Sequence, residues 1–189
     1  MAVDLPDAHA RALDVARRFV AGVRPNHWSL ESTCSDWDVR ELVNHLVAGN
    51  LWVPELVAGH SIEEVGDRLD GAVLGDDALG VYDSSAAAAA AAFRSGGAME
   101  RPVKVSYGPV PGSVYCGHRF IDVLVHGWDV AKSTGQNALL PGELVEACLE
   151  VIEPQKEILA ASGAFGTEVR VPPDADGQVR LLALLGRVA

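Results

Sequence analysis

The sequence has few basic residues, few aromatic residues and no long apolar run. Its 15 Lys and Arg side chains stand against 26 Asp and Glu, which gives a formal net charge of −11. Affinity for nucleic acid and for anionic membrane surfaces depends largely on clustered Lys and Arg. No apolar run reaches the ~20 residues that a membrane-spanning helix needs. The sequence therefore predicts no nucleic-acid partner and no membrane association.

Motifs built on cysteine pairs are also missing. The chain has three widely spaced cysteines and no CxxC pair. An odd number without a pattern predicts a reduced, cytoplasmic protein with packed or incidental thiols, and a reactive cysteine is the alternative. The N-terminal residues MAVDLPDAHARAL contain no basic segment followed by an apolar one, so no signal peptide is expected. The cysteines are Cys34, Cys116 and Cys148.

Glycine-rich phosphate cradles are absent as well. Gly96-Gly97 and Gly112 follow no expected strand and form no GxGxxG, which disfavours a nucleotide cofactor. The 189 residues, 49% of them hydrophobic, suit one domain with a sizeable core. We therefore expect residues 1–189 to form a single domain.

Helical periodicity dominates what is present, and alternation typical of strands is sparse. A helix bundle follows: an all-α fold with a four-helix-bundle core and additional short helices. Ser35 or Asp36 is expected to cap the second helix, and Asp83-Ser-Ser85 the alanine-rich third helix. The expected helices cover about 7–23, VRELVNHLVAGNLWV with a kink near Pro54, a turn at SIEEV, AAAAAAAFRS, 113–133, 142–162 with a kink at Pro154, and QVRLLALLGR, with one short strand at VKVSY.

An ionisable stripe runs along the apolar segment CGHRFIDVLVHGWDVA. On a helix, His118, Asp122, His126 and Asp129 fall within a sector of roughly 80°, with apolar residues on both flanks. Burial of an unpaired carboxylate costs several kcal/mol. Three arrangements avoid that cost: the stripe faces water, its His and Asp side chains pair inside the bundle, or they hold a cation.

The spacing within this stripe suits metal binding. Asp122 and His126 stand at i and i+4, so one helix can offer both side chains to a single ion. A third ligand should come from another helix, and the candidate is His45. It lies roughly 130° from the centre of its own apolar stripe, which fits either a surface histidine or one that points into a cleft edged by Trp52.

Three motifs together resemble a known family. They are TCSDWDVRELVNH at 33–45, DVLVHGWDVAKSTG at 122–135 and LLALLGR at 181–187. The sequence resembles actinobacterial metal-binding proteins of the DinB/YfiT-like superfamily, in the subgroup related to the N-terminal domain of mycothiol-dependent maleylpyruvate isomerase. The likeness covers nearly the whole chain.

The resemblance implies a four-helix bundle that holds a divalent metal, zinc or nickel. The family's metal ligands match His45, Asp122 and His126 here, and relatives carry Glu or His where this chain has Asp122. Three ligands leave positions open for water or a thiol. His118 and Asp129 are then expected beside the ligating imidazoles, where a carboxylate can accept a free N–H. For Asp129, an ion pair with Lys or Arg is the alternative.

The activity of the isomerase is not carried over, because its additional C-terminal domain has no counterpart expected in this chain. The first hypothesis is a metal-dependent transferase or isomerase that presents a small-molecule thiol, mycothiol, to an electrophilic substrate. The alternative is a non-catalytic metal-binding protein with a stress or regulatory role. The third is a purely structural bundle. A monomer and a homodimer are both compatible with the sequence.

Overall fold

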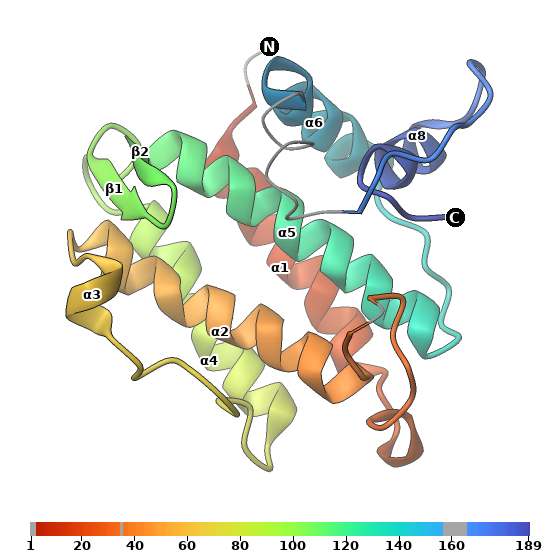
Figure 1. The fold of residues 1–189 in the computed structure, drawn as a ribbon, viewed down its shortest axis with the longest axis horizontal. Coiled ribbons are helices and arrows are strands. Elements are labelled where there is room, and N and C mark those ends of the chain that lie inside the picture. Colours follow the sequence, from red (N-terminus) through yellow and green to blue (C-terminus); the bar gives the residue numbers. More distant parts are fainter. Residues whose placement is uncertain (1–2, 35, 157–165) are drawn as a thin grey trace. The chain divides into compact units, whose positions relative to one another are not determined.

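The computed structural model describes residues 3–34, 36–156 and 166–189. Residues Asp4–Ala138 form one compact unit, and Leu139–Ala189 belong to a second. The first unit contains α1 (Leu5–Ala21), α2 (Val39–Val57), α3 (Ile62–Val65), α4 (Ala78–Phe93), β1 (Pro102–Val105), β2 (Gly108–Pro111) and α5 (Gly112–Ser133) (Figure 1). The second contains α6 (Gly142–Ile152) and α8 (Gly177–Leu184). A single domain over the whole chain stays a prediction.

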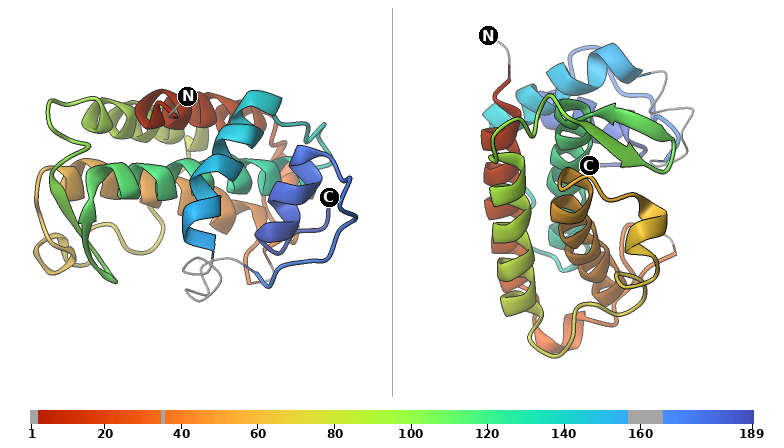
Figure 2. Two further views of the ribbon diagram at one scale, coloured as in Figure 1. Left: turned by 90° about the horizontal axis from the view of Figure 1, so that it is seen from above. Right: turned by 90° about the vertical axis from the view of Figure 1, so that its left-hand side faces the viewer.

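Helices α1, α2, α4 and α5 pack as a four-helix bundle (Figure 2). Helix α1 packs against α5, and α2 packs against α4; α1 also touches α4, and α2 touches α5. The predicted all-α bundle is therefore confirmed. Among the described residues, no helix combines the length and the apolar character that would let it cross a bilayer.

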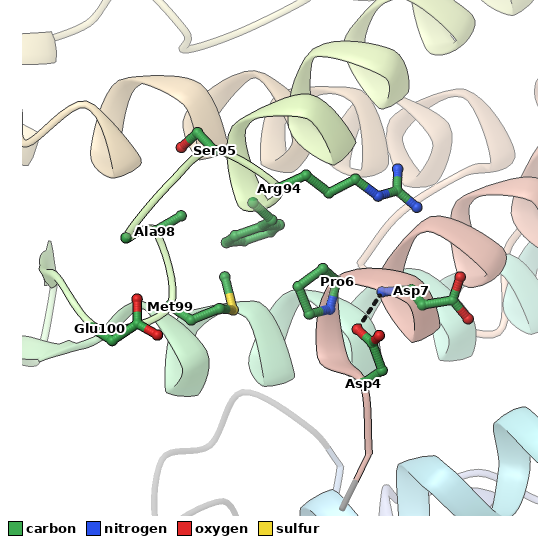
Figure 3. Close-up of a pocket in the computed structure, with 10 residues that line it drawn as sticks. Asp4, Pro6, Asp7, Arg94, Ser95, Ala98, Met99 and Glu100 are labelled. Atoms are coloured by element: carbon green, nitrogen blue, oxygen red, sulfur yellow. Dashed lines mark hydrogen bonds between the residues drawn. The ribbon is translucent and has the colours of Figure 1, made fainter.

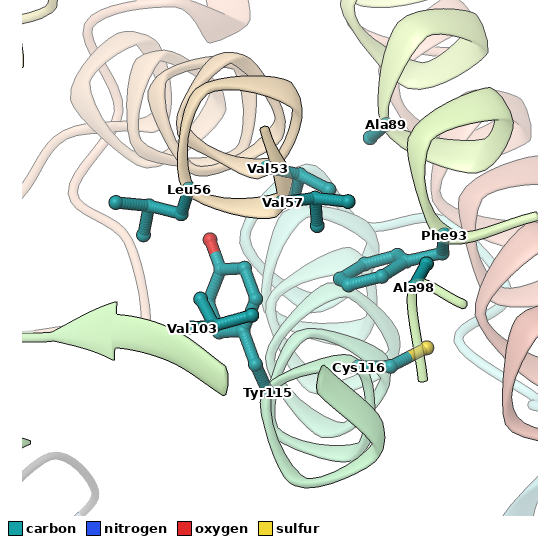
Figure 4. Close-up of a cluster of buried hydrophobic side chains, with 9 residues drawn as sticks. All are labelled: Val53, Leu56, Val57, Ala89, Phe93, Ala98, Val103, Tyr115 and Cys116. Atoms are coloured by element: carbon teal, nitrogen blue, oxygen red, sulfur yellow. The ribbon is translucent and has the colours of Figure 1, made fainter. Parts of the chain in front are cut away.

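One end of the bundle core is filled by aliphatic and aromatic side chains from α2, α4, α5 and the β1 segment (Figure 4). Phe93 and Tyr115 meet edge-on, with ring centroids 5.6 Å apart. Ala89 of the alanine tract is fully buried there, as expected for a small side chain in close helix packing. The cluster consists of Val53, Leu56, Val57, Ala89, Phe93, Ala98, Val103, Tyr115 and Cys116.

Helices α1 and α5 approach closely because α5 carries a glycine at their contact. A Cβ placed on Gly127 would lie 2.9 Å from the Cβ of Ala16 and 3.1 Å from its Cα. We expect Gly127→Val to lower the free energy of unfolding by about 1–3 kcal/mol, because the added methyl groups must push the helices apart. Urea denaturation measures this change in the free energy of unfolding. Gly96→Ala is the control, since no heavy atom lies within 4 Å of that Cβ; equal midpoints for both variants would contradict the packing argument.

The structure differs from expectation at the start of α4, at the predicted strand and at the end of α6, and by two to four residues at the ends of α1 and α2. Helix α4 begins at Ala78 with Asp77 as its cap, not at Asp83-Ser-Ser85. The hydroxyls of Ser84 and Ser85 instead donate to carbonyls one turn back in the helix, an alternative that serine always has. The short strand expected at VKVSY is one half of a hairpin, in which β1 and β2 pair antiparallel.

The third difference concerns α6. It ends at Ile152, and a 3-10 turn, Glu153–Gln155, follows with Pro154 inside it. Proline lacks the N–H that an α-helix needs at this point, which accounts for the change. Residues 157–162 of the expected helix lie outside the described residues.

Candidate metal centre

Three side chains from two helices converge at the contact between α2 and α5. His45 comes from α2, and Asp122 and His126 come from successive turns of α5. One ligand atom from each of the three lies within 4.8 Å of the other two. The structure thus brings together the three residues that the sequence singled out.

The distances within this triad are longer than those of direct ion-pair hydrogen bonds. His45 Nε2 lies 3.3 Å from Asp122 Oδ1, and His126 Nε2 lies 3.6 Å from the same oxygen. Charge-assisted N–H···O bonds are ~2.7–2.9 Å long. Two ligands that bind a tetrahedral ion at ~2.0–2.1 Å lie ~3.3 Å apart. The contact between His45 and Asp122 also meets the geometry of a hydrogen bond, so the spacing fits ligands of one shared ion as well as a His–Asp pair.

His126 is oriented by a buried carboxylate. Its Nδ1 lies 3.0 Å from Asp129 Oδ2, and Asp129 is fully buried. The hydroxyl of Thr33 donates to the other oxygen, Oδ1, over 2.6 Å. An ionised carboxylate can only accept, so with Asp129 ionised the imidazole proton belongs on Nδ1 and the lone pair of Nε2 faces Asp122. This arrangement is typical of a metal-ligating histidine and its supporting carboxylate.

A second group of converging ligand atoms shares His126. Cys34 Sγ lies 3.7 Å from His126 Nδ1 and donates to Asp129 Oδ2 over 3.5 Å. Cys34, His126 and Asp129 could hold an ion by proximity alone. A neutral imidazole offers only one lone pair, however, so one histidine cannot serve both groups. The hydrogen bond to Asp129 favours the group with His45 and Asp122.

The segment before α2 folds back on itself and places these supporting side chains. Asp38 caps α2 and forms a reciprocal capping box with Glu41, so the expected caps, Ser35 or Asp36, are wrong. Ser32 N–H donates to the carbonyl of Trp37, which closes the segment into a tight loop. The Thr33 N–H donates to Ser133 Oγ of α5. The loop is thereby fixed to the helix that carries Asp129.

The aromatic neighbour of His45 is Trp37. Their ring centroids lie 4.7 Å apart with an interplanar angle of 30°. Trp52, which the sequence placed at the edge of this cleft, packs instead against the hydrophobic cluster at the end of the bundle. The side chain of His45 is 33% exposed, so the triad has one open side while His126 is buried.

Asp122 is also paired with a buried guanidinium. Arg119 Nη1 donates to its Oδ2 over 2.8 Å. Burial opposes ionisation of Asp122 most strongly, yet Arg119, His126 and His45 together hold the pKa of this carboxyl well below its usual range. The lowered pKa favours the ionised carboxylate of Asp122 at neutral pH. The sequence did not predict Arg119, although its i, i+3 spacing to Asp122 was a signal.

Two other expectations need adjustment. The ring of His118 lies against Tyr107 and hydrogen-bonds to its hydroxyl, and His118 belongs to neither described group of converging ligand atoms. Cys116 and Cys148 are packed thiols, and burial raises the pKa of Cys116 to about 12. Cys34 differs from them in its surroundings: it is partly exposed and lies beside His126 and Asp129.

A separate pocket of about 400 Å³ opens near the N-terminus of α1 (Figure 3). Asp4 caps α1 there by accepting from the Asp7 N–H. Arg94 and Glu100 add opposite charges to the wall. The residues that line this pocket do not include the three candidate ligands, so it is distinct from the triad.

Residues 9–131, which include all three candidate ligands, match the family described as the mycothiol maleylpyruvate isomerase N-terminal domain. The chain belongs to this family. A crystal structure of a histidine-to-alanine mutant of the mycothiol-dependent maleylpyruvate isomerase has the same fold, with a TM-score of 0.66 and 21% identity over 87% of this chain and 74% of that one.

Two relatives with a higher sequence identity than this crystal structure align over nearly the full length of the chain. Two uncharacterized proteins of Mycobacterium tuberculosis, MT0763 of strain CDC 1551 / Oshkosh and Rv0738 of strain ATCC 25618 / H37Rv, are each 34% identical over 184 residues. The alignment covers 95% of this chain and 96% of each relative. The resemblance drawn from the motifs is therefore confirmed at the level of the family.

Proposed function

We propose that this protein binds one divalent metal ion, zinc or nickel, through His45, Asp122 and His126. The observation that carries the proposal is the convergence of their ligand atoms within 4.8 Å of one another, with spacings that suit a shared ion. Two imidazoles and one carboxylate with a further open position are typical of reactive rather than structural zinc sites. Nickel, iron and manganese also accept such a ligand set, to differing degrees.

We propose further that the site serves a thiol-dependent transfer or isomerisation. A bound divalent ion would supply Lewis acidity, which lowers the pKa of a coordinated thiol and keeps it as a nucleophilic thiolate. His45 and Trp37 form the side of the triad that is partly exposed, which gives a small-molecule thiol a route of access. Asp129 keeps the proton of His126 on Nδ1 and thereby keeps Nε2 available.

Mycothiol is the thiol we propose, because the solved structure with this fold is a mycothiol-dependent isomerase. Thiol binding that depends on the metal is the property that separates this proposal from a non-catalytic metal-binding role.

The test is calorimetric titration of mycothiol into untagged protein loaded with one equivalent of zinc, beside the same protein stripped of metal. We expect saturable binding to the loaded protein and none to the stripped protein. The His45→Ala variant, handled identically, should behave as the stripped protein does. Stoichiometric zinc without any thiol binding would support the non-catalytic role instead, and absence of zinc binding would leave only a structural bundle.

Asp129 provides a prediction about the support of the ligand His126. We expect Asp129→Asn to weaken zinc affinity about 10–100-fold, because the amide lacks the charge that holds the Nδ1 proton of His126. Competition with a chromophoric chelator measures the change. Asp83→Asn is the matched control, since Asp83 pairs with Arg17 on the surface of the bundle. Equal affinities for Asp129→Asn and the unmodified protein would rule out this role.

A further inference from the structure

Arg119 is a buried cation that touches the triad without belonging to it. Its side chain is 10% exposed, and that of Asp122 is 18% exposed. The guanidinium donates from Nη1 to Asp122 Oδ2, while Asp122 Oδ1 faces the Nε2 atoms of His45 and His126. One carboxylate oxygen is thus engaged by Arg119, and the other is directed to the imidazoles.

The fold holds this guanidinium in place from a second helix. A Cβ on Gly49 of α2 would lie 2.3 Å from Arg119 Nη1 and 2.5 Å from its Cζ, so only glycine leaves room for it. Arg119 Nη2 reaches Asn50 Oδ1 over 3.4 Å. The Asn50 amide lies 3.4 Å from Ser85 Oγ of α4, which donates to the Tyr82 carbonyl. Three helices therefore fix the position of one arginine.

Stability alone does not explain this arrangement. Replacement of a buried ion pair by apolar side chains is often neutral or stabilising, because two charges must leave water. Arg119 Nε is buried and has no hydrogen-bond partner among the described residues. An unsatisfied buried donor costs about 1–3 kcal/mol. The guanidinium is therefore better explained by its effect on Asp122.

We infer that Arg119 is a positioning residue that limits Asp122 to one coordinating oxygen and makes the open position of the metal site selective for anionic ligands. The inference rests on the proposed metal site. A divalent ion, the carboxylates of Asp122 and Asp129, and the guanidinium of Arg119 together carry one net positive charge. An anionic ligand such as a thiolate neutralises that charge. Without Arg119 the sum is already zero, and Asp122 can bind the ion through both oxygens.

The experiment uses the full chain loaded with Co²⁺, with azide as the anionic probe. Visible absorption of the bound Co²⁺ reports coordination number, since four-coordinate Co²⁺ absorbs more strongly than six-coordinate Co²⁺. In Arg119→Met we expect weaker d–d absorption and azide affinity lowered about tenfold or more, the scale of one nearby unit charge at an effective dielectric constant of ~20. Arg119→Lys retains the charge and should recover most of the azide affinity.

Two further variants keep the result decisive. Gly49→Ala displaces the guanidinium without removing it and should change both readouts in the same direction as Arg119→Met. It provides the same test if Arg119→Met does not fold. Arg17→Met is the control, because it removes an arginine paired with Asp83 on the bundle surface. Unchanged spectra and azide affinity in folded Arg119→Met or Gly49→Ala overturn the inference. Failure of the unmodified protein to bind Co²⁺ overturns the proposed function itself.

Discussion

Replacement of His126 by alanine is expected to lower metal affinity by about 10²–10⁴-fold. Zinc binding to protein sites is worth ~10–16 kcal/mol, so one of three ligands accounts for ~3–5 kcal/mol. His126 is the most buried of the three and the one that Asp129 supports through Nδ1. Its loss removes the Nε2 donor of the triad and leaves the buried Asp129 without its imidazole partner.

The measurement is zinc content by elemental analysis, combined with chelator competition, on protein purified without an affinity tag. His118→Ala is the matched control, since His118 lies on the same helix two turns before His126 and contacts Tyr107. The control should retain one equivalent of zinc. If His126→Ala retains the same stoichiometry and affinity as His118→Ala, the triad is not the metal site.

His9 is expected to make the protein less stable as the pH falls below about 6.5. It is fully buried on α1, edge-on to Phe93, and neither ring nitrogen has a hydrogen-bond partner among the described residues. Burial, followed by the positive charges of Arg119 and Arg94, lowers the pKa of His9 to about 3, and Asp122 opposes this only partly. The folded protein therefore keeps His9 neutral.

The direction of the pH effect follows from the protons bound. Between pH ~6.5 and ~3 the unfolded chain protonates His9 and the folded chain does not, so stability rises with pH across this window. The contribution is fully present above pH ~6.5. Below it, stability is lost at up to ~1.4 kcal/mol per pH unit.

Comparison with His9→Leu isolates this effect. Leucine does not titrate, so the variant should lack the His9 part of the slope, and it removes two unsatisfied buried nitrogens that each cost about 1–3 kcal/mol. Urea denaturation of metal-free protein at pH 7 and pH 5 measures the difference. Parallel pH profiles for His9→Leu and the unmodified protein would show that His9 is not the group responsible.

Local pattern was enough to predict most of the bundle. Helix α5 matched its expected span within one residue, because apolar periodicity acts over a few residues and Pro and Gly mark the two ends of the segment. Helix α4 was placed less well. Both Asp77 and the Asp83-Ser-Ser85 segment carry side chains that can cap, and local sequence does not say which of them the backbone uses.

The candidate site likewise has a part that the local sequence predicts and a part that depends on helix packing. The pairing of Asp122 with His126 follows from helical geometry alone, since residues four apart share a face. The position of His45 relative to that pair depends on how α2 packs against α5. The sequence pattern of α2 alone allowed His45 to lie either on the surface or in a cleft. The stacking of Trp37 on His45 was missed, because only the loop before α2 brings that ring across.

By itself, the sequence determined the all-α bundle, the two candidate ligands on α5 and the family to which the chain belongs, because each depends on contacts within a few turns or on contiguous motifs. Only the tertiary structure decided that Thr33 and Cys34 lie beside Asp129, that Arg119 turns inward to Asp122, and that His45 faces the same oxygen as His126. Those contacts join positions up to 96 residues apart, and the packing of whole helices sets them.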